Sequence, residues 1–186
     1  MRVTDAYPTG YDPSNDPIEI VEYDPTWPEK FALEKRAIFH GLGFMPGLKV
    51  EHFGSTSVPG LAAKPIIDIM VGVSRKEDWP KLVKPIEMKG YIYWSNNPKP
   101  DEMFFIKGMP PYGARRTHHL HVYDLFGERW KKELAFRDYL IAHPQEAKNY
   151  EALKKNLLMR FHYDREAYTE GKKPYIELVL KKIYSS

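Results

Sequence analysis

The hydrophobic positions of this chain form strand-like runs in its first two thirds and helical stripes in its last third. Residues 65–73 are almost continuously apolar, which is typical of a strand that is covered on both faces. Between Tyr150 and Phe161, apolar residues recur every three or four positions, which indicates one face of a helix. The patterns predict strands at 18–23, 48–53, 65–73, 91–94, 103–107 and 117–123, a helical turn at 58–63, and helices at 26–43, 74–90, 127–142, 144–162 and 172–184.

This order of elements predicts an α+β fold, with a small mixed sheet packed by helices and a helical C-terminal third. Pro80 and Pro85 predict that the helix over 74–90 is kinked or broken. Residues 1–17 are rich in Pro, Gly, Asp and Asn, so we expect an extended N-terminal arm there. The segment 18–186 has no internal repeat or linker and is expected to form a single domain.

Composition limits the class of protein. The chain has 186 residues, of which 42% are hydrophobic and 28% charged, as is ordinary for a soluble globular domain. No apolar run approaches the ~20 residues that cross a bilayer, and the first residues lack the apolar core of a signal peptide. We therefore expect a cytoplasmic protein that does not bind membranes. The sequence contains no Cys, which excludes disulfides and thiolate metal sites.

The charge pattern bears on the kind of partner. The net charge is +3, and Lys and Arg are spread along the chain. Nucleic-acid-binding surfaces usually cluster their cations, so this pattern argues against a nucleic-acid partner. A small phosphorylated ligand requires only a few local cations and agrees with the pattern.

The segment around Gly54-Ser55 is the strongest candidate for chemistry. A predicted strand ends there, a turn rich in hydroxyl groups follows, and the next strand carries one carboxylate, Asp68. Small residues let backbone N–H groups approach an anion, and hydroxyl groups add donors. The alternative is a plain turn, in which Gly supplies backbone freedom and a hydroxyl caps the next helix.

Four stretches resemble the GrpB family, which belongs to the polymerase-beta-like nucleotidyltransferase superfamily. They are 51–71, 116–122, 136–140 and 166–172. The similarity runs from about Ile18 to Ile183, and it implies a nucleotidyltransferase-like sheet and helices. It also implies that the loop after the first core strand holds ligand phosphates, through Gly54 and Ser55 with Thr56 and Ser57 as nearby donors.

Asp68 is placed where the superfamily has two acids spaced two residues apart, which hold two divalent ions. Here Ile66, Asp68 and Met70 share one face of the strand, and only Asp68 is acidic. The resemblance therefore implies a catalytic Asp68 with a divalent metal, Mg²⁺ or Mn²⁺, but not a site of three carboxylates. The alternative is a structural ion pair between Asp68 and Lys64 or an Arg.

His119 and His121 lie on the same side of a predicted strand, and His118 faces the other side. Two such imidazoles and one carboxylate can form a three-ligand site for Zn²⁺, Mn²⁺ or Fe²⁺. Asp68 is one candidate for the carboxylate, and Glu51 is the second. The alternatives are hydrogen bonds from both imidazoles to a phosphate or to backbone groups, and general acid–base catalysis by His121.

Cations near these motifs are candidates for phosphate binding. Lys64 and Arg116 come first, because they precede the strand of Asp68 and the strand of the His pair. Further candidates lie in the predicted C-terminal helices: Arg137, Lys154 and Lys172. By resemblance, Asp101-Glu102 replaces a basic pair that relatives often carry, so a phosphate contact is not expected there.

Three functions follow from these features. The first is a nucleotidyltransferase-like protein that binds a nucleotide or phosphorylated metabolite with a divalent metal and transfers a nucleotidyl group to a small acceptor. The second is a non-catalytic nucleotide or coenzyme-binding module, because Asp68 is a single acid and relatives occur fused to an enzyme of coenzyme A synthesis. The third is a metal-dependent phosphohydrolase that uses Asp68, His119 and His121.

Overall fold

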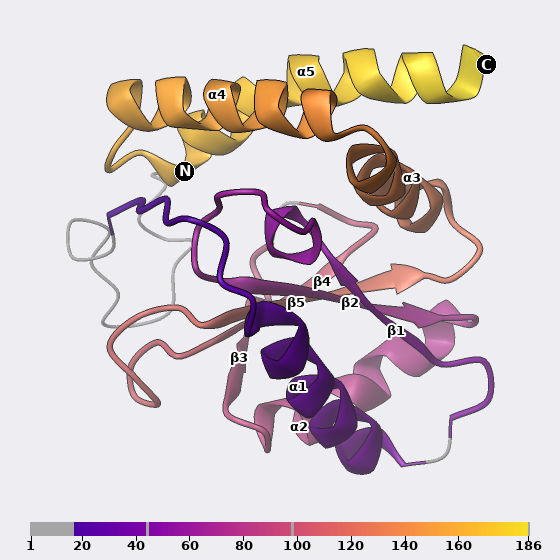
Figure 1. Ribbon diagram of the computed structural model, residues 1–186. Helices are drawn as coiled ribbons and strands as arrows, with labels where there is room; N and C mark the ends of the chain where they lie inside the picture. The colour runs from indigo at the N-terminus through magenta and orange to yellow at the C-terminus, as the bar shows by residue number, and fades with distance from the viewer. Residues whose placement is uncertain (1–16, 44, 98, 186) are drawn as a thin grey trace.

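A five-stranded mixed sheet forms the centre of the protein (Figure 1). The structure is a computed structural model that describes residues 17–43, 45–97 and 99–185. The strand order is β1-β2-β5-β4-β3, in which β2 and β5 are parallel and the other neighbours antiparallel. The strands are β1 (Lys49–Phe53), β2 (Ile67–Val73), β3 (Tyr91–Tyr93), β4 (Met103–Lys107) and β5 (His118–Asp124).

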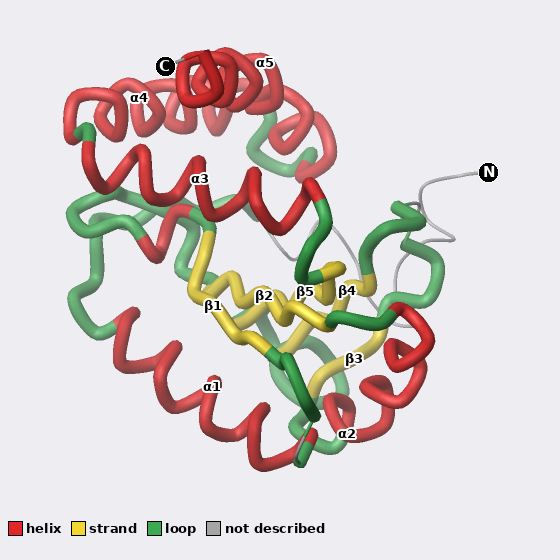
Figure 2. The backbone as a smooth tube through the Cα atoms, turned by 90° about the vertical axis from the view of Figure 1, so that its right-hand side faces the viewer, coloured by secondary structure: helices red, strands yellow, loops and turns green. Residues whose placement is uncertain are grey.

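Helices cover both faces of the sheet, as Figure 2 shows. On one side lie α1 (Trp27–Leu42) and the short α2 (Val83–Glu87). On the other side lie α3 (Glu128–Ala142), α4 (Pro144–Arg160) and α5 (Arg165–Ser185). The expected α+β fold with a helical C-terminal third is thus confirmed.

Alternation along the strands sends successive side chains to opposite faces. Ile67, Ile69 and Val71 of β2 pack into the main core, which Trp27 and Ile38 of α1 complete. The opposite face carries a smaller apolar cluster of Phe53, Met70, Tyr123 and, from α3, Trp130. Asp68 alternates with the main-core residues of β2 and therefore belongs to this second face.

The C-terminal helices are attached to the loop between β1 and β2. Val58 and Leu61 of this loop form an apolar cluster with Phe136 of α3, Tyr150 of α4 and Val179 of α5. Burying side chains of this size contributes roughly 1.5–3 kcal/mol each before the loss of conformational entropy is counted. This packing fixes α5 next to the loop that was singled out for its glycine and hydroxyl groups.

The strand predicted at 18–23 was wrong. The segment 18–23 contains one isolated bridge, Val21 to Ala63, and no strand. The Ile18 amide instead donates to the His162 carbonyl oxygen, and its side chain packs against Leu157, so the backbone partners needed for a strand are elsewhere. The expected arm lies outside the described residues except for its last residue, Pro17.

Two other elements differ in extent, and the break predicted in a third is confirmed. The helical turn expected at 58–63 occurs earlier, as a 3₁₀ helix at Ser55–Ser57, because Pro59-Gly60 forms a turn. The segment 74–90 is broken, as expected, into a 3₁₀ helix at Lys76–Leu82 and then α2. The last helix begins at Arg165 and not at 172.

No helix within the described ranges is long and apolar enough to cross a membrane.

Candidate metal and phosphate site

Three potential metal ligands meet on the sheet face that α3 covers. Because β2 and β5 are parallel neighbours, Asp68 lies opposite His119, and Met70 opposite His121. The two histidines are two residues apart and therefore share this face. One ligand atom each from Asp68, His119 and His121 lies within 4.8 Å of the others. The structure thus brings together three of the four residues that the sequence proposed as metal ligands.

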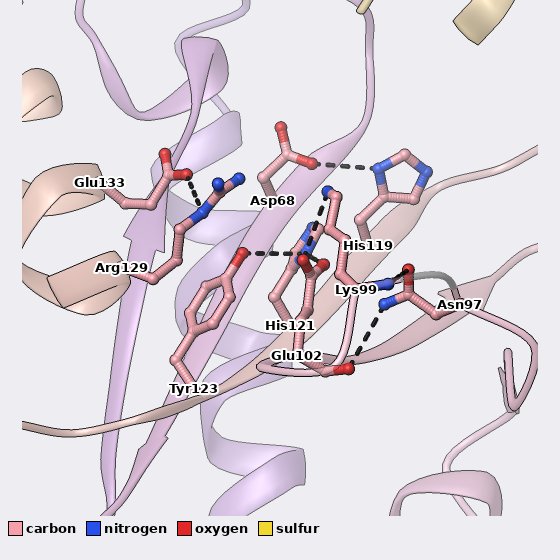
Figure 3. Close-up of polar contacts among 9 residues, drawn as sticks. All are labelled: Asp68, Asn97, Lys99, Glu102, His119, His121, Tyr123, Arg129 and Glu133. Carbon is pink, nitrogen blue, oxygen red and sulfur yellow. Dashed lines mark hydrogen bonds and ion pairs between the residues drawn. The ribbon is translucent and has the colours of Figure 1, made fainter. Parts of the chain in front are cut away.

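The first pair within this group is Asp68 and His119. Nδ1 of His119 lies 3.1 Å from Oδ1 of Asp68 (Figure 3). Burial lowers the pKa of His119 to about 3, although the hydrogen bond to Asp68 opposes the fall. Burial alone would raise the pKa of Asp68, but the hydrogen bond and nearby positive charge leave it below its usual value. At neutral pH the pair is therefore a carboxylate and a neutral imidazole.

The protonation of this pair determines which nitrogen of His119 has a lone pair that can accept a hydrogen bond or bind a metal ion. An ionised carboxylate only accepts hydrogen bonds, so Nδ1 of His119 carries the hydrogen. Nε2 then carries the lone pair, and this atom is buried with no hydrogen-bond partner in the described parts of the chain. A buried acceptor without a partner is costly, so this nitrogen is available to a metal ion or a hydrogen-bond donor.

Glu102 orients the second histidine. Its Oε1 lies 2.5 Å from Nδ1 of His121, and Lys99 approaches its other oxygen at 3.3 Å (Figure 3). Burial would raise the pKa of Glu102, yet the charge and hydrogen bond of His121, with Lys99, lower it to about 2. Glu102 is therefore ionised and accepts a hydrogen bond from Nδ1 of His121, so the lone pair of the neutral ring is on Nε2.

Sequence reasoning missed this role for Glu102. It treated the Asp101-Glu102 pair only as the loss of a basic contact. Alternation alone predicts that positions 102, 104 and 106 share one face. The pairing of β4 with β5, which places Phe104 opposite His121, could not be read from the sequence.

The Gly54 loop presses directly on Asp68. Gly54 has φ +69° and ψ −171°, a conformation that residues with a Cβ avoid. A Cβ built there would lie 2.5 Å from Oδ2 of Asp68. Only glycine therefore lets the loop backbone approach the carboxylate this closely.

The three hydroxyl groups of the loop differ in their partners. Ser57 Oγ donates to the Gly54 carbonyl oxygen at 2.6 Å, and Thr56 Oγ1 lies 3.0 Å from Nε2 of His52. These two side chains hold the loop in shape. The Ser55 hydroxyl has no hydrogen bond to any described residue, so it is the donor of this loop that a ligand could engage.

Lysines from three segments supply positive charge. Lys64 and Lys172 lie over the Tyr168 ring, at 5.4 and 5.0 Å from its centroid, and Lys154 donates to the Ala62 carbonyl oxygen at 2.5 Å. Burial, with repulsion from Lys172, lowers the pKa of Lys64 and of Lys154 to about 7. No carboxylate of the described residues forms an ion pair with Lys64, Lys154 or Lys172. Lys154 is buried and the other two are half-buried, and a charge removed from water without a partner is costly, so these ammonium groups are candidates for contact with an anion.

Three further residues that the sequence proposed for the site, Arg137, Glu51 and Arg116, are not in the group formed by Asp68, His119 and His121. Arg137 contacts Oε2 of Glu51 at 3.1 Å and the His52 carbonyl oxygen at 2.8 Å, so it joins α3 to β1. Glu51 is thereby engaged in an ion pair and is not among the residues grouped around Asp68. Arg116 is buried and lines a small pocket at the start of β2.

The donor set fits a divalent transition metal. Asp68, His119 and His121 each offer one ligand atom, and these three atoms lie within 4.8 Å of one another. Glu102 behind His121 is the kind of carboxylate that fixes the ring of a metal-binding histidine. Two imidazoles and one carboxylate suit Zn²⁺, Fe²⁺ or Mn²⁺ better than Mg²⁺, which prefers oxygen ligands.

Comparison with solved structures identifies the class of fold. A structure of the Cid1 poly(U) polymerase, a mutant bound to MgATP, superimposes with a TM-score of 0.51 at 12% identity, over 76% of this chain and 45% of that one. The protein therefore has a nucleotidyltransferase-like fold. The profile described as GrpB protein matches residues 17–182, and the chain belongs to the GrpB family. The crystal structure of conserved protein GrpB from Enterococcus faecalis has a TM-score of 0.78 at 36% identity, over 89% of this chain and 96% of that one.

Curated relatives differ in length from this chain. A UPF0157 protein of Pseudomonas aeruginosa is 48% identical over 89% of this chain and 67% of its own length. UPF0157 protein YqkA of Bacillus subtilis is 37% identical over 86% of this chain, which spans 45% of that protein. A dephospho-CoA kinase of Mycolicibacterium paratuberculosis is 30% identical over 86% of this chain, which spans 44% of it.

Proposed function

We propose that this protein binds a nucleotide or related phosphorylated metabolite together with a divalent metal and transfers a nucleotidyl group to a small acceptor. One observation carries the proposal. The Gly54 loop lies against Asp68, while Lys64 and Lys172 lack carboxylate partners among the described residues and act electrostatically on the same carboxylate. A metal-binding group and an anion-binding group therefore share one site.

Each residue has a role in this proposal. Asp68, His119 and His121 would hold a divalent ion, which when bound supplies Lewis-acid polarisation of a phosphoryl oxygen. The Ser55 hydroxyl donates to a phosphate oxygen beside it. Lys154 and Lys172 balance the negative charge of the ligand. Glu102 keeps His121 in one tautomer.

A thermal-shift screen tests the binding. Nucleoside triphosphates and coenzymes are added with and without Mn²⁺, Zn²⁺ or Mg²⁺ to the wild type, Ser55→Ala, Asp68→Asn and the control Asp138→Asn, whose side chain is exposed. A ligand that binds the folded state raises its Tm by mass action. The proposal predicts a metal-dependent shift that Asp68→Asn abolishes and Asp138→Asn retains. A shift that all variants show equally would refute the proposed site.

A phosphohydrolase is the second candidate, and Met70 is the observation that favours it. Met70, and not a second acid, follows Asp68 on its strand face, and His119 and His121 lie opposite these two residues on β5. Product analysis separates the candidates. A nucleotidyltransferase forms an acceptor–nucleotide product only when an acceptor is present. A hydrolase transfers the group to water, and it therefore releases phosphate or nucleoside monophosphate from the nucleotide without any other acceptor.

A binding module without transfer chemistry is the third candidate, because Asp68 is the one acid on its strand face. The similarity to a dephospho-CoA kinase makes coenzyme A and dephospho-CoA suitable ligands for the screen. Tight binding of one of these compounds without any product, under each metal tested, would favour this candidate over both enzymes.

A further inference from the structure

An arginine that the sequence did not single out lies beside the metal-binding residues. Arg129 is in the first turn of α3, and its side chain is 52% exposed. Its Nε lies 2.9 Å from Oε1 of Glu133, one helical turn further along α3. An ion pair in such contact with water contributes little to stability, because water screens both charges. The main effect of Glu133 is therefore to hold the guanidinium group in one direction, which Figure 3 shows to be toward Asp68.

Arg129 also acts on the groups that support His121. Partial burial would lower the pKa of the guanidinium group, but Glu133, Tyr123 and Glu102 raise it. The Tyr123 hydroxyl lies 3.4 Å from Nδ1 of His121, and Glu102 contacts the same nitrogen. The guanidinium group is therefore within electrostatic reach of both groups that contact this nitrogen.

Glu133 acts on a second cation, which comes from a different helix. Burial lowers the pKa of Lys172 of α5, and Asp68 and Glu133 oppose this fall. The charges around Lys172 thus include the ion-pair partner of Arg129. Arg129 and Lys172 therefore border one region beside Asp68, the first from α3 and the second from α5.

We propose that Arg129 is a further ligand-binding residue, whose terminal nitrogens contact a phosphate of the ligand that the metal also binds. The inference rests on the proposed function for the metal and for the phosphorylated ligand. The ion pair with Glu133 uses Nε, and a guanidinium group has further N–H donors on its two terminal nitrogens. These paired donors match the oxygens of a phosphate.

Metal binding alone separates this role from a structural one. If Arg129 only supported Glu102 and Tyr123, its loss would loosen His121 and weaken metal binding. If it contacts the phosphate, Arg129→Gln removes a positive charge that repels the metal. The affinity for Zn²⁺ and Mn²⁺ should then be unchanged or up to about threefold higher. Competition with a chromophoric chelator measures it, and a tenfold loss would overturn the proposal.

Nucleotide binding should respond in the opposite direction. Calorimetry with ADP and Mn²⁺ compares the wild type with Arg129→Gln, Arg129→Lys and Glu133→Gln. Loss of a charged hydrogen bond predicts about tenfold weaker binding in Arg129→Gln. Arg129→Lys keeps the charge without the paired donors, so its loss should be smaller. Glu133→Gln keeps the cation and removes a carboxylate, so it should bind ADP at least as tightly as the wild type does.

Two results of this comparison would overturn the proposal. The first is equal affinity for ADP in the wild type and Arg129→Gln. The second is the same loss in Glu133→Gln as in Arg129→Gln, because it would show that the ion pair matters only for the structure. Arg75→Gln is the control for the loss of one positive charge, since Arg75 is exposed and follows the far end of β2, and it should change neither affinity.

Failure of the proposed function gives a different result. A wild type that binds no nucleotide with any of the metals refutes that function. Inorganic phosphate is then titrated in EDTA, and NMR follows the side-chain Nε–H signal of Arg129, which is assigned by its absence from Arg129→Gln. A signal that moves with phosphate, while the backbone signals around Arg75 stay in place, supports the contact. A signal that does not move overturns it.

Discussion

Glu102 and His121 form a buried hydrogen bond in which the carboxylate determines the tautomer of the imidazole. The 2.5 Å contact joins Oε1 of Glu102 to Nδ1 of His121, and the Glu102 side chain is only 4% exposed. Burying a charge this deeply costs free energy unless neighbouring groups pair with it or donate hydrogen bonds to it. Here it directs the lone pair of His121 to Nε2, the nitrogen that a metal or a phosphate proton could engage.

Glu102→Gln is therefore expected to weaken metal binding by about 10- to 100-fold, because the amide no longer fixes the ring as a carboxylate does. Competition with a chromophoric chelator measures the affinity for Zn²⁺ and Mn²⁺. Asp101→Asn is the matched control, because Asp101 is adjacent but exposed and pairs with Lys76 at 2.9 Å. If both variants bind metal as the wild type does, Glu102 does not position His121.

Gly54→Ala is expected to destabilise the protein more than Gly60→Ala does. Both glycines have positive φ, +69° and +77°, but an added Cβ meets Asp68 at the first and open space at the second. The backbone strain alone costs about 1 kcal/mol, and the contact with Asp68 should add about 1–2 kcal/mol. Urea unfolding measures both values. Equal losses would show that the loop does not press on Asp68 in solution.

Phosphate binding is expected to take up protons near pH 8. The pKa values of Lys64 and Lys154 are about 7 in the folded protein, against an ordinary value of 10.5. A bound phosphate favours the charged amines, so binding raises these pKa values and weakens as pH rises above about 7. Calorimetry with ADP in buffers of different ionisation enthalpy measures the uptake. Lys154→Met should reduce it, whereas Lys155→Met, which removes an exposed lysine paired with Glu151, should not.

The same pKa values set the pH dependence of stability. Between pH about 7 and 10.5 the unfolded chain binds more protons at these two lysines than the folded chain does. Their contribution to the free energy of unfolding therefore rises with pH across this window and is unfavourable below it. Urea titrations of the wild type and Lys154→Met at pH 6.5 and 9 measure the effect, and parallel pH dependences would contradict it.

Glu34→Gln is expected to destabilise the opposite face of the sheet. Glu34 of α1 accepts two hydrogen bonds from Nζ of Lys107, at 2.8 and 2.9 Å, and its side chain is 10% exposed. Breaking a largely buried pair leaves an uncompensated charge, at a cost of about 2 kcal/mol here. Glu29→Gln, on the exposed side of the same helix, should change the free energy of unfolding by less than about 0.5 kcal/mol. A similar loss in both variants would refute this reading of the pair.

The sequence was most informative where the pattern is local. The apolar run of β2 and the two-residue spacing of His119 and His121 determine which side chains share a face. Glu102 and the Glu51–Arg137 pair escaped prediction, because both depend on neighbours that are distant in sequence. The start of α5 was missed for another reason. Gly171 and Pro174 argue against helix locally, but the helix is continuous from Arg165, and Gly171 lets α5 approach Leu157 of α4 closely.

The site is divided between two layers of the fold. Asp68 and His119 belong to the sheet, whereas Tyr168 and Lys172 belong to α5, which the apolar cluster around Val179 holds in place. A ligand bound at the proposed site would connect these two layers, and its release would break contacts with α5 as well as with the sheet. Its residence time would then depend on the motion of α5 as well as on the individual contacts. Backbone amides of α5 would exchange with solvent more slowly in the complex, while those of α1, on the far side of the sheet, would keep their rates.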